Sequence, residues 1–158
     1  MLDAFRVETF MRLKNFKASI LLFVLLSSIA ESSSASKWFL ITQTQDIKIF
    51  IDRESLRING PKIKVWEKWV YTRPQEVLSS SPEKTYSSEK ILAVYRCDER
   101  ASAFLQINEY ADRDGSSEIV QHFSYPDIPS LYTQIVPDSL NEHILEFICS
   151  MKKSPKQI

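Results

Sequence analysis

The stretch Leu56–Tyr71, LRINGPKIKVWEKWVY, decides the fold. Apolar and polar residues alternate through Lys62–Tyr71, and β-branched and aromatic types are frequent, which is typical of a half-buried β-strand. Asn59-Gly60 stands between this run and Leu56–Ile58, and that dipeptide favours the tight turn of a β-hairpin. The stretch therefore predicts two antiparallel strands joined by a short reversal.

Similar short extended runs flank this hairpin on both sides. The predicted strands are Trp38–Ile41, Ile47–Ile51, Ile91–Cys97, Ala103–Tyr110 and Ile119–Phe123, with a turn at Asp112–Gly115 before the last. Arg73–Ser88 contains two prolines and five serines, so we expect a long exposed loop there. The chain up to this point predicts an antiparallel sheet of about six strands.

From Ser139 onward the spacing of apolar residues changes to that of a helix. Leu140, Ile144, Ile148 and Met151 fall on one stripe, as in an amphipathic helix that packs on a core. Ser139 and the glutamate three residues later form a capping box. The prediction is an α+β domain over residues 36–150 with one C-terminal helix packed on the sheet, followed by a short basic tail, 151–158.

Composition excludes several classes of function. Twenty basic and twenty acidic residues cancel, so there is no basic field that would favour a nucleic-acid partner. Two glycines in 158 residues leave no glycine-rich loop for a nucleotide pyrophosphate. We expect no cofactor.

The N-terminal residues 1–35 have the features of an export signal, predicted as a signal helix. Ile20–Leu26 is an unbroken apolar run preceded by basic residues, and it is too short for a membrane span. Cleavage would follow Ala30 or Ala35, and translation could start at Met11, since the acidic residues before it suit a signal poorly. We expect an exported protein, periplasmic or secreted, with no membrane span after processing and no lipid anchor, because no cysteine lies near the cleavage region.

Removal of the signal leaves Cys97 and Cys149 as the only cysteines. An exported chain matures where thiols oxidise, so a single intramolecular disulfide is expected. Closing a loop of this length stabilises the fold by about 4 kcal/mol in the chain-entropy model. The alternative role of Cys97 as a nucleophile lacks a neighbouring base.

Several short motifs follow one another in a set order: Phe50-Ile51-Asp52, Ser55-Leu56, Lys64-Val65-Trp66, Tyr95-Arg96-Cys97, Tyr110 before Gly115, Val136-Pro137-Asp138-Ser139, and Cys149. Together they resemble the surface-adhesin E family from Trp38 to Cys149. The resemblance implies a small antiparallel sheet with a disulfide-held C-terminal helix. It also implies an exported, non-enzymatic protein, which in some bacterial members binds host extracellular proteins such as vitronectin and laminin.

The chain departs from this family in two respects. Characterised members are usually displayed as lipoproteins, and the required cysteine after the signal is missing here. The family also tends to have a glycine before the serine that starts the helix and a tryptophan a few residues earlier, where this chain has Asp138 and Tyr132.

Few residues suit catalysis or metal binding. Ser139 and His143 are four residues apart on the predicted helix, but the serine is better used as a cap. Asp112-x-Asp114-Gly115 resembles the start of a calcium loop without its remaining ligands, so it is interpreted as a hairpin turn. His122 alternates with its strand neighbours and is interpreted as a strand residue. We therefore predict no enzyme activity and no metal site.

The strand Lys62–Tyr71 supplies the candidate partner-binding residues, which alternation places on one face: Lys62, Lys64, Trp66 and Lys68. Tryptophan is enriched at binding hot spots, and lysines steer an acidic partner. The structural alternative is that Trp66 packs beneath the helix with the lysine stems laid over it. Lys84 and the serines of the predicted loop offer a second contact, with an unstructured loop as the alternative.

These observations favour an exported, adhesin-like module that binds a protein partner. The alternative is a periplasmic small-ligand-binding or accessory domain, suggested by the aromatic stretch Tyr125–Tyr132 and testable as an apolar pocket between helix and sheet. A strand left unpaired at a sheet edge would allow a homodimer.

Overall fold

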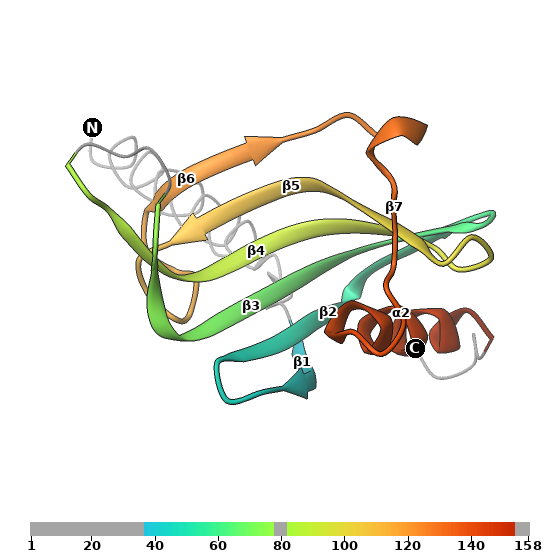
Figure 1. Cartoon of the computed structure of the whole chain (residues 1–158), viewed down its shortest axis with the longest axis horizontal. Coiled ribbons are helices and arrows are strands. Elements are labelled where there is room, and N and C mark those ends of the chain that lie inside the picture. Colours follow the sequence, from blue (N-terminus) through green and yellow to red (C-terminus); the bar gives the residue numbers. More distant parts are fainter. Residues whose placement is uncertain (1–36, 78–81, 154–158) are drawn as a thin grey trace, which may run out of the picture. The chain divides into compact units, whose positions relative to one another are not determined.

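The computed structural model describes residues 37–77 and 82–153 (Figure 1). The predicted export signal at 1–35, with its start and cleavage sites, lies outside the described residues, as does most of the predicted basic tail, 154–158. Within the described ranges, no helix has the combination of length and hydropathy that a membrane crossing requires.

The described chain forms one antiparallel sheet and one long helix. The elements are β1 (Trp38–Gln43), β2 (Ile47–Asn59), β3 (Lys62–Glu76), β4 (Thr85–Arg96), β5 (Ala101–Tyr110), β6 (Ile119–Ser124), a 3-10 turn η1 (Pro129–Leu131), β7 (Thr133–Gln134) and α2 (Leu140–Lys153). Strands β1 to β6 pair in sequence order, and the short β7 pairs with the first two residues of β5, Ala101 and Ser102. The predicted α+β class is confirmed.

Two predicted strands are one strand in the structure. Strand β2 runs through both Ile47–Ile51 and Leu56–Ile58, and its pairing with β3 shifts register between Asp52 and Arg57. The bulge is satisfied locally, because Ser55 Oγ donates to the Asp52 carbonyl at 2.6 Å and accepts from the Trp66 N–H at 2.9 Å. A polar stretch that resembles a turn is therefore a β-bulge.

The prediction of a loop at Arg73–Ser88 is wrong at both ends of this range, where the residues belong to strands. Strand β3 continues to Glu76 and β4 begins at Thr85. The pairing shifts register between Val70 and Gln75, around Pro74, and such an irregularity is where a strand tolerates a residue without an N–H. Ser88 is fully buried, and its hydroxyl donates to the Asp112 carbonyl at 2.7 Å.

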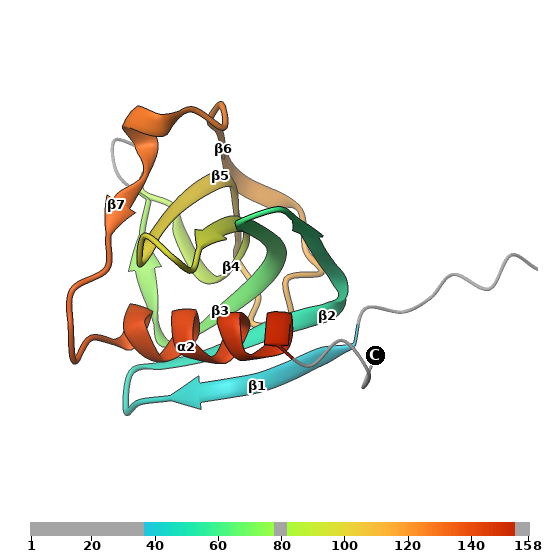
Figure 2. The ribbon, with the colours of Figure 1, turned by 90° about the vertical axis from the view of Figure 1, so that its right-hand side faces the viewer.

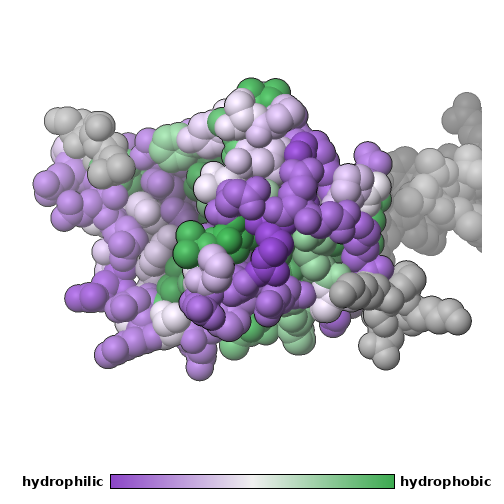
Figure 3. Space-filling model, turned by 45° about the vertical axis from the view of Figure 1, so that its right-hand side comes forward, coloured by the Kyte–Doolittle hydropathy of each residue, from purple (hydrophilic) through white to green (hydrophobic). Residues whose placement is uncertain are grey.

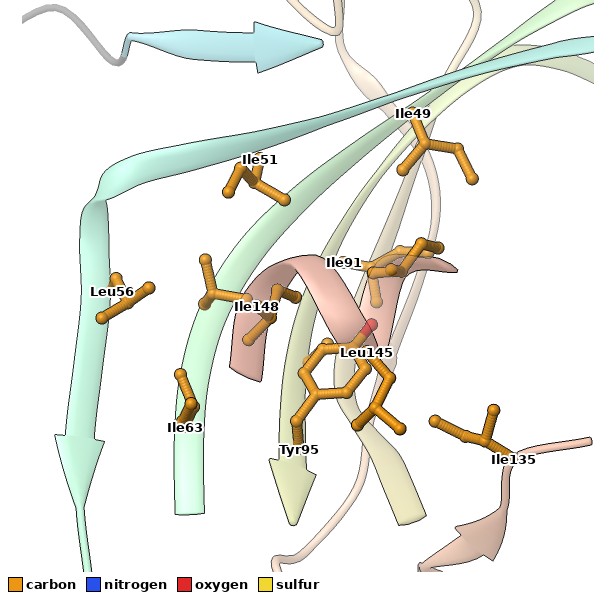
Figure 4. Close-up of a cluster of buried hydrophobic side chains, with 12 residues drawn as sticks. Ile49, Ile51, Leu56, Ile63, Ile91, Tyr95, Ile135, Leu145 and Ile148 are labelled. Carbon is orange, nitrogen blue, oxygen red and sulfur yellow. The ribbon is translucent and has the colours of Figure 1, made fainter. Parts of the chain in front are cut away.

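Helix α2 packs on one face of the sheet and closes the main core. Figure 4 shows Leu145 and Ile148 of the helix among side chains of β2, β3 and β4. The buried cluster consists of Ile49, Ile51, Leu56, Ile63, Val65, Ile91, Ala93, Tyr95, Ile135, Ile144, Leu145 and Ile148. The helix lies beside β1 (Figure 2) and also contacts β3 and β4. Ile144 and Ile148 of the predicted apolar stripe are fully buried, so this stripe is the face that the helix buries.

Two local devices fix this helix. The Sγ atoms of Cys97 and Cys149 are 2.05 Å apart, with their Cα atoms at 5.8 Å, which confirms the predicted disulfide between the end of β4 and α2. At the other end, Ser139 Oγ accepts from the Glu142 N–H at 3.2 Å, and the Glu142 carboxylate accepts from the Asp138 N–H at 2.6 Å. The capping box is therefore present, with the carboxylate reaching one residue further back than in the usual motif.

Candidate binding face of the sheet

The face of the sheet opposite α2 carries the residues singled out from sequence. Side chains alternate along a strand, and Ile63 and Val65 of β3 belong to the core cluster under the helix. Lys62, Lys64, Trp66 and Lys68 therefore point to the other face, which we call the helix-free face. The alternative in which Trp66 packs beneath the helix is wrong, because α2 covers the opposite side.

Cross-strand register aligns polar and aromatic residues into two rows on the helix-free face. The first row is Phe50, Lys68, Lys90, Asn108 and His122, on β2 to β6. The second row is Trp38, Asp52, Trp66, Leu92 and Gln106, on β1 to β5. Residues directly opposite each other have their Cβ atoms within about 5.5 Å, so each side chain in a row can reach its neighbours on the adjacent strands.

A groove of about 420 Å³ opens between these rows. Its aromatic lining consists of Trp38, Trp66 and Tyr110, and its polar lining consists of Asp52, Lys90, Gln106 and Asn108. A concave site with aromatic walls and a few polar groups is the usual form of a ligand site. Sequence alternation identified only Trp66 in this groove, because the other lining residues come from four further strands.

The ammonium groups beside the groove lie over aromatic rings. Lys68 Nζ is 5.1 Å from the ring centroid of Trp38 and 5.2 Å from that of Phe50, and Lys90 Nζ is 5.1 Å from the ring of Tyr110. These distances are those of cation–π contacts. Partial burial, with the charge of Lys90 opposite, lowers the pKa of Lys68 despite the carboxylates of Asp112 and Asp114.

Lys62 has a structural role that its sequence position did not reveal. Its Nζ is 2.9 Å from Asp127 Oδ1 and 5.4 Å from the ring centroid of Tyr132, whose hydroxyl donates to the same Asp127 oxygen at 2.7 Å. The guanidinium of Arg96 lies over the same Tyr132 ring, with its Cζ 3.9 Å from the ring centroid. The ion pair with Asp127 raises the pKa of Lys62. Lys62 thus holds the chain before β7 against the sheet and is less available to a partner than Lys64 or Lys68.

The residues considered for catalysis or metal binding serve the fold. Ser139 caps α2 and donates to the Val136 carbonyl at 2.6 Å. Asp112 accepts from the hydroxyl and N–H groups of Ser116 and Ser117, which lowers the pKa of its carboxyl and closes the predicted hairpin turn. His122 Nδ1 is 2.6 Å from Asn108 Oδ1. In the described part of the chain, no group of three or more His, Cys, Asp or Glu side chains is arranged to hold a metal ion.

The disulfide removes the free thiol that a nucleophilic Cys97 would need. A hollow of about 650 Å³ lies beside it at the end of α2, where Asp98, Arg100 and Lys152 contribute to the lining. Its lining mixes charged side chains with Leu145 and the disulfide, and it is formed by α2 and the residues that follow β4. The space under the helix is instead filled by the core cluster.

A group of buried carboxylates on the helix-covered face was missed by sequence reasoning. Glu67, Glu89 and Glu109 are 0%, 8% and 7% exposed, and Glu89 lies directly opposite Glu109 in the β4–β5 pairing. Burial raises the pKa of all three. The available signal was that Glu67 interrupts an otherwise apolar alternation on β3.

Within the described residues, the sheet, the helix packed on one of its faces and the disulfide define a class of small α+β domains with one covered and one open sheet face. The protein-family model described as surface-adhesin protein E matches residues 38–150. The chain therefore belongs to the surface-adhesin protein E family, as its motifs indicated.

Solved structures of protein E from Haemophilus influenzae share this fold. The selenomethionine form matches with a TM-score of 0.53 at 14% identity, over 75% of this chain and 90% of that one. The crystal structure of protein E from non-typeable Haemophilus influenzae matches with a TM-score of 0.52 at 13% identity, over 78% and 82%. No curated protein matches the sequence.

Proposed function

We propose that this protein is an exported, adhesin-like module that binds a macromolecular partner through the helix-free face. The observation that carries the proposal is the groove on that face, with Trp66 in its lining and Lys64 and Lys68 beside it. Membership in a surface-adhesin family supports export and a role other than catalysis. The partner class that the resemblance implies is host extracellular proteins.

The surface of the domain is mixed in polarity on the side that one space-filling view shows (Figure 3). On the side shown in Figure 3, hydrophilic residues predominate and hydrophobic ones form separate patches. Aromatic anchors in a concave site contribute most of the binding energy in such interfaces, while surrounding lysines set the rate of encounter. Trp66 would be the anchor, and Lys64 and Lys68 would steer an acidic surface toward it.

The small-ligand alternative loses its expected location, since the core cluster fills the space between helix and sheet. The export signal at 1–35, the absence of a lipid anchor and homodimer formation remain proposals from the sequence. Cell fractionation with mass spectrometry of the mature N-terminus tests the first two. Size-exclusion chromatography with light scattering tests the third, with β1 and β6 as the sheet edges available for pairing.

The binding role is tested with the purified mature domain and immobilised vitronectin and laminin in biolayer interferometry. We expect saturable binding that Trp66→Ala and Lys64→Glu weaken, while Lys152→Ala on α2 serves as the control. Thermal melts establish that each variant is folded. Binding that is absent for every partner, or unchanged in both variants, would contradict the proposal.

A further inference from the structure

Two lysines on the helix-free face occupy positions that favour an anion between them. Lys68 and Lys90 are directly opposite each other on β3 and β4, and like charges in such a pair destabilise a sheet. Asp112 and Asp114 lie near enough to act on Lys68, yet its pKa remains lowered. Partial burial is the largest cause of this lowered pKa, and Asp114 acts on Lys68 more strongly than Lys90 does. A ligand carboxylate beside Lys68 would therefore offset the lost hydration of its ammonium group.

Neither ammonium group is held in an ion pair within the described part of the chain. Among the described residues, the contacts of Lys68 Nζ and Lys90 Nζ are with the ring faces of Trp38, Phe50 and Tyr110, and neither forms an ion pair within 4.0 Å. A ring face takes one side of an ammonium and accepts no conventional hydrogen bond, so donors remain for a ligand. A carboxylate is suited to two such donors because charge-assisted hydrogen bonds are the strong ones.

The rest of the groove suits hydroxyl groups. Asn108 Oδ1 lies 2.6 Å from His122 Nδ1 and accepts from Gln106 Nε2 at 3.3 Å, which turns the donor end of the Asn108 amide away from both. Asp52 stands on the other side of the groove and accepts hydrogen bonds only. A group that both donates and accepts, as a hydroxyl does, can satisfy an amide and a carboxylate at once.

The occupant must be recognised by side chains alone. The backbone groups of β2 to β5 are paired on both sides within the sheet, so an extended peptide cannot add as a strand at this face. A sugar ring needs no backbone partner: its apolar face stacks on Trp66 or Tyr110, and its hydroxyls meet the polar lining. A heavily sulfated chain fits less well, because sulfates would lie against Asp52.

From this geometry we propose that the groove binds a terminal sugar ring that carries one carboxylate, with the carboxylate between Lys68 and Lys90 and the hydroxyls on Asp52, Gln106 and Asn108. This inference rests on the proposed function, because it assigns the recognised group to an acidic glycan of a host glycoprotein. Charge complementarity at the lysine pair and the donor–acceptor pattern of the groove support it.

The test uses sialyllactose, which ends in such an acidic sugar, and lactose as its neutral counterpart. The protein has three tryptophans, and their indole N–H signals in ¹⁵N-labelled protein report on position. Trp38 and Trp66 line the groove, whereas Trp69 donates to buried Glu67 under the other face at 2.8 Å. Sialyllactose should shift the first two signals saturably and leave Trp69 unmoved, and lactose should shift none.

Lys90→Met keeps the side-chain stem and removes the charge, so we expect binding about tenfold weaker, the loss of one charge-assisted hydrogen bond. Lys152→Met is the matched control and should bind normally. Equal shifts with lactose, tighter binding of a heparin oligosaccharide, or unchanged affinity of Lys90→Met would each overturn the inference. If a glycoprotein partner binds through Trp66 equally well after removal of its acidic sugars, the proposed function stands and this inference fails; if no partner binds at all, both fail.

Discussion

Glu67 gives the sharpest quantitative prediction, because it is a carboxyl group fully buried in the core. Trp69 Nε1 donates to its Oε2 at 2.8 Å, and the Tyr95 hydroxyl donates to its Oε1. These two hydrogen bonds favour the ionised form, but loss of hydration outweighs them and raises its pKa from 4.5 to about 7. The neutral form is therefore the one that the fold prefers.

The sign and size of the pH dependence follow from this shift. Because the folded pKa lies above the unfolded value, the stabilisation is complete below about pH 4.5 and is lost as the pH rises through 7. The shift from 4.5 to about 7 corresponds to about 3 kcal/mol. The pKa values of Glu89 and Glu109 are also raised, so they add loss in the same direction.

Urea denaturation of the disulfide-bonded domain from pH 4 to pH 8 measures this effect. Glu67→Gln replaces the carboxyl by a neutral amide that can accept from Trp69 and donate to the Tyr95 oxygen. We expect the variant to equal the wild type within about 1 kcal/mol at pH 4 and to be about 2–3 kcal/mol more stable at pH 8. The exposed Glu118→Gln serves as the control. A stability difference between Glu67→Gln and the wild type that does not change with pH would refute the reasoning.

Two further predictions concern the helix. The double variant Cys97→Ser/Cys149→Ser opens a loop with a sequence separation of 52, and its free energy of unfolding should fall by about 4 kcal/mol; a fall below 1 kcal/mol in urea titration would show that packing alone holds α2. Asp138 has φ +58°, so Asp138→Gly should relieve left-handed strain and stabilise by about 0.5–1 kcal/mol; a lower melting temperature in calorimetry would contradict this.

Asp138 also explains one of the two departures from the family pattern. The resemblance to the family implies a glycine at this position, and the left-handed backbone observed here is the conformation that glycine adopts at least cost. Aspartate is among the few other residues that visit it. The substitution is therefore tolerated without a change in the path of the chain into α2.

The elements read correctly from sequence are those whose signals are local. The hairpin between β2 and β3, the apolar stripe of α2 and the Ser139 cap depend on neighbours a few residues away, and the two cysteines had only one pairing. The hairpin turn itself is shifted by one residue from the prediction, because Asn59 pairs with Lys62 and the turn residues are Gly60 and Pro61. The errors fall where distant residues decide the outcome. The bulge after Asp52 is held by the hydrogen bond that the Trp66 N–H of β3 donates to Ser55 Oγ. Pro74 stays within β3 because the pairing with β4 shifts register around it.

The candidate site was predicted in part for the same reason. Alternation on β3 placed Trp66, Lys64 and Lys68 on one face, but it could not show which residues of β1, β2, β4 and β5 complete the groove. That depends on register, which here brings Lys90 opposite Lys68 and Asp52 opposite Trp66. Lys62 was assigned to the binding face without its ion pair to Asp127, 65 residues away.

The register of strand β3 decides which of its residues lie on each face of the sheet. Its odd-numbered residues, such as Val65 and Glu67, are buried on the helix side, and its even-numbered residues, such as Trp66, line the groove. A register slip of one residue in β3 would exchange the two sets and place the lysines in the core. Burying these charges without partners would destabilise the fold strongly. The disulfide holds α2 against one face of the sheet, where the helix closes the core. The other face therefore remains uncovered by the helix.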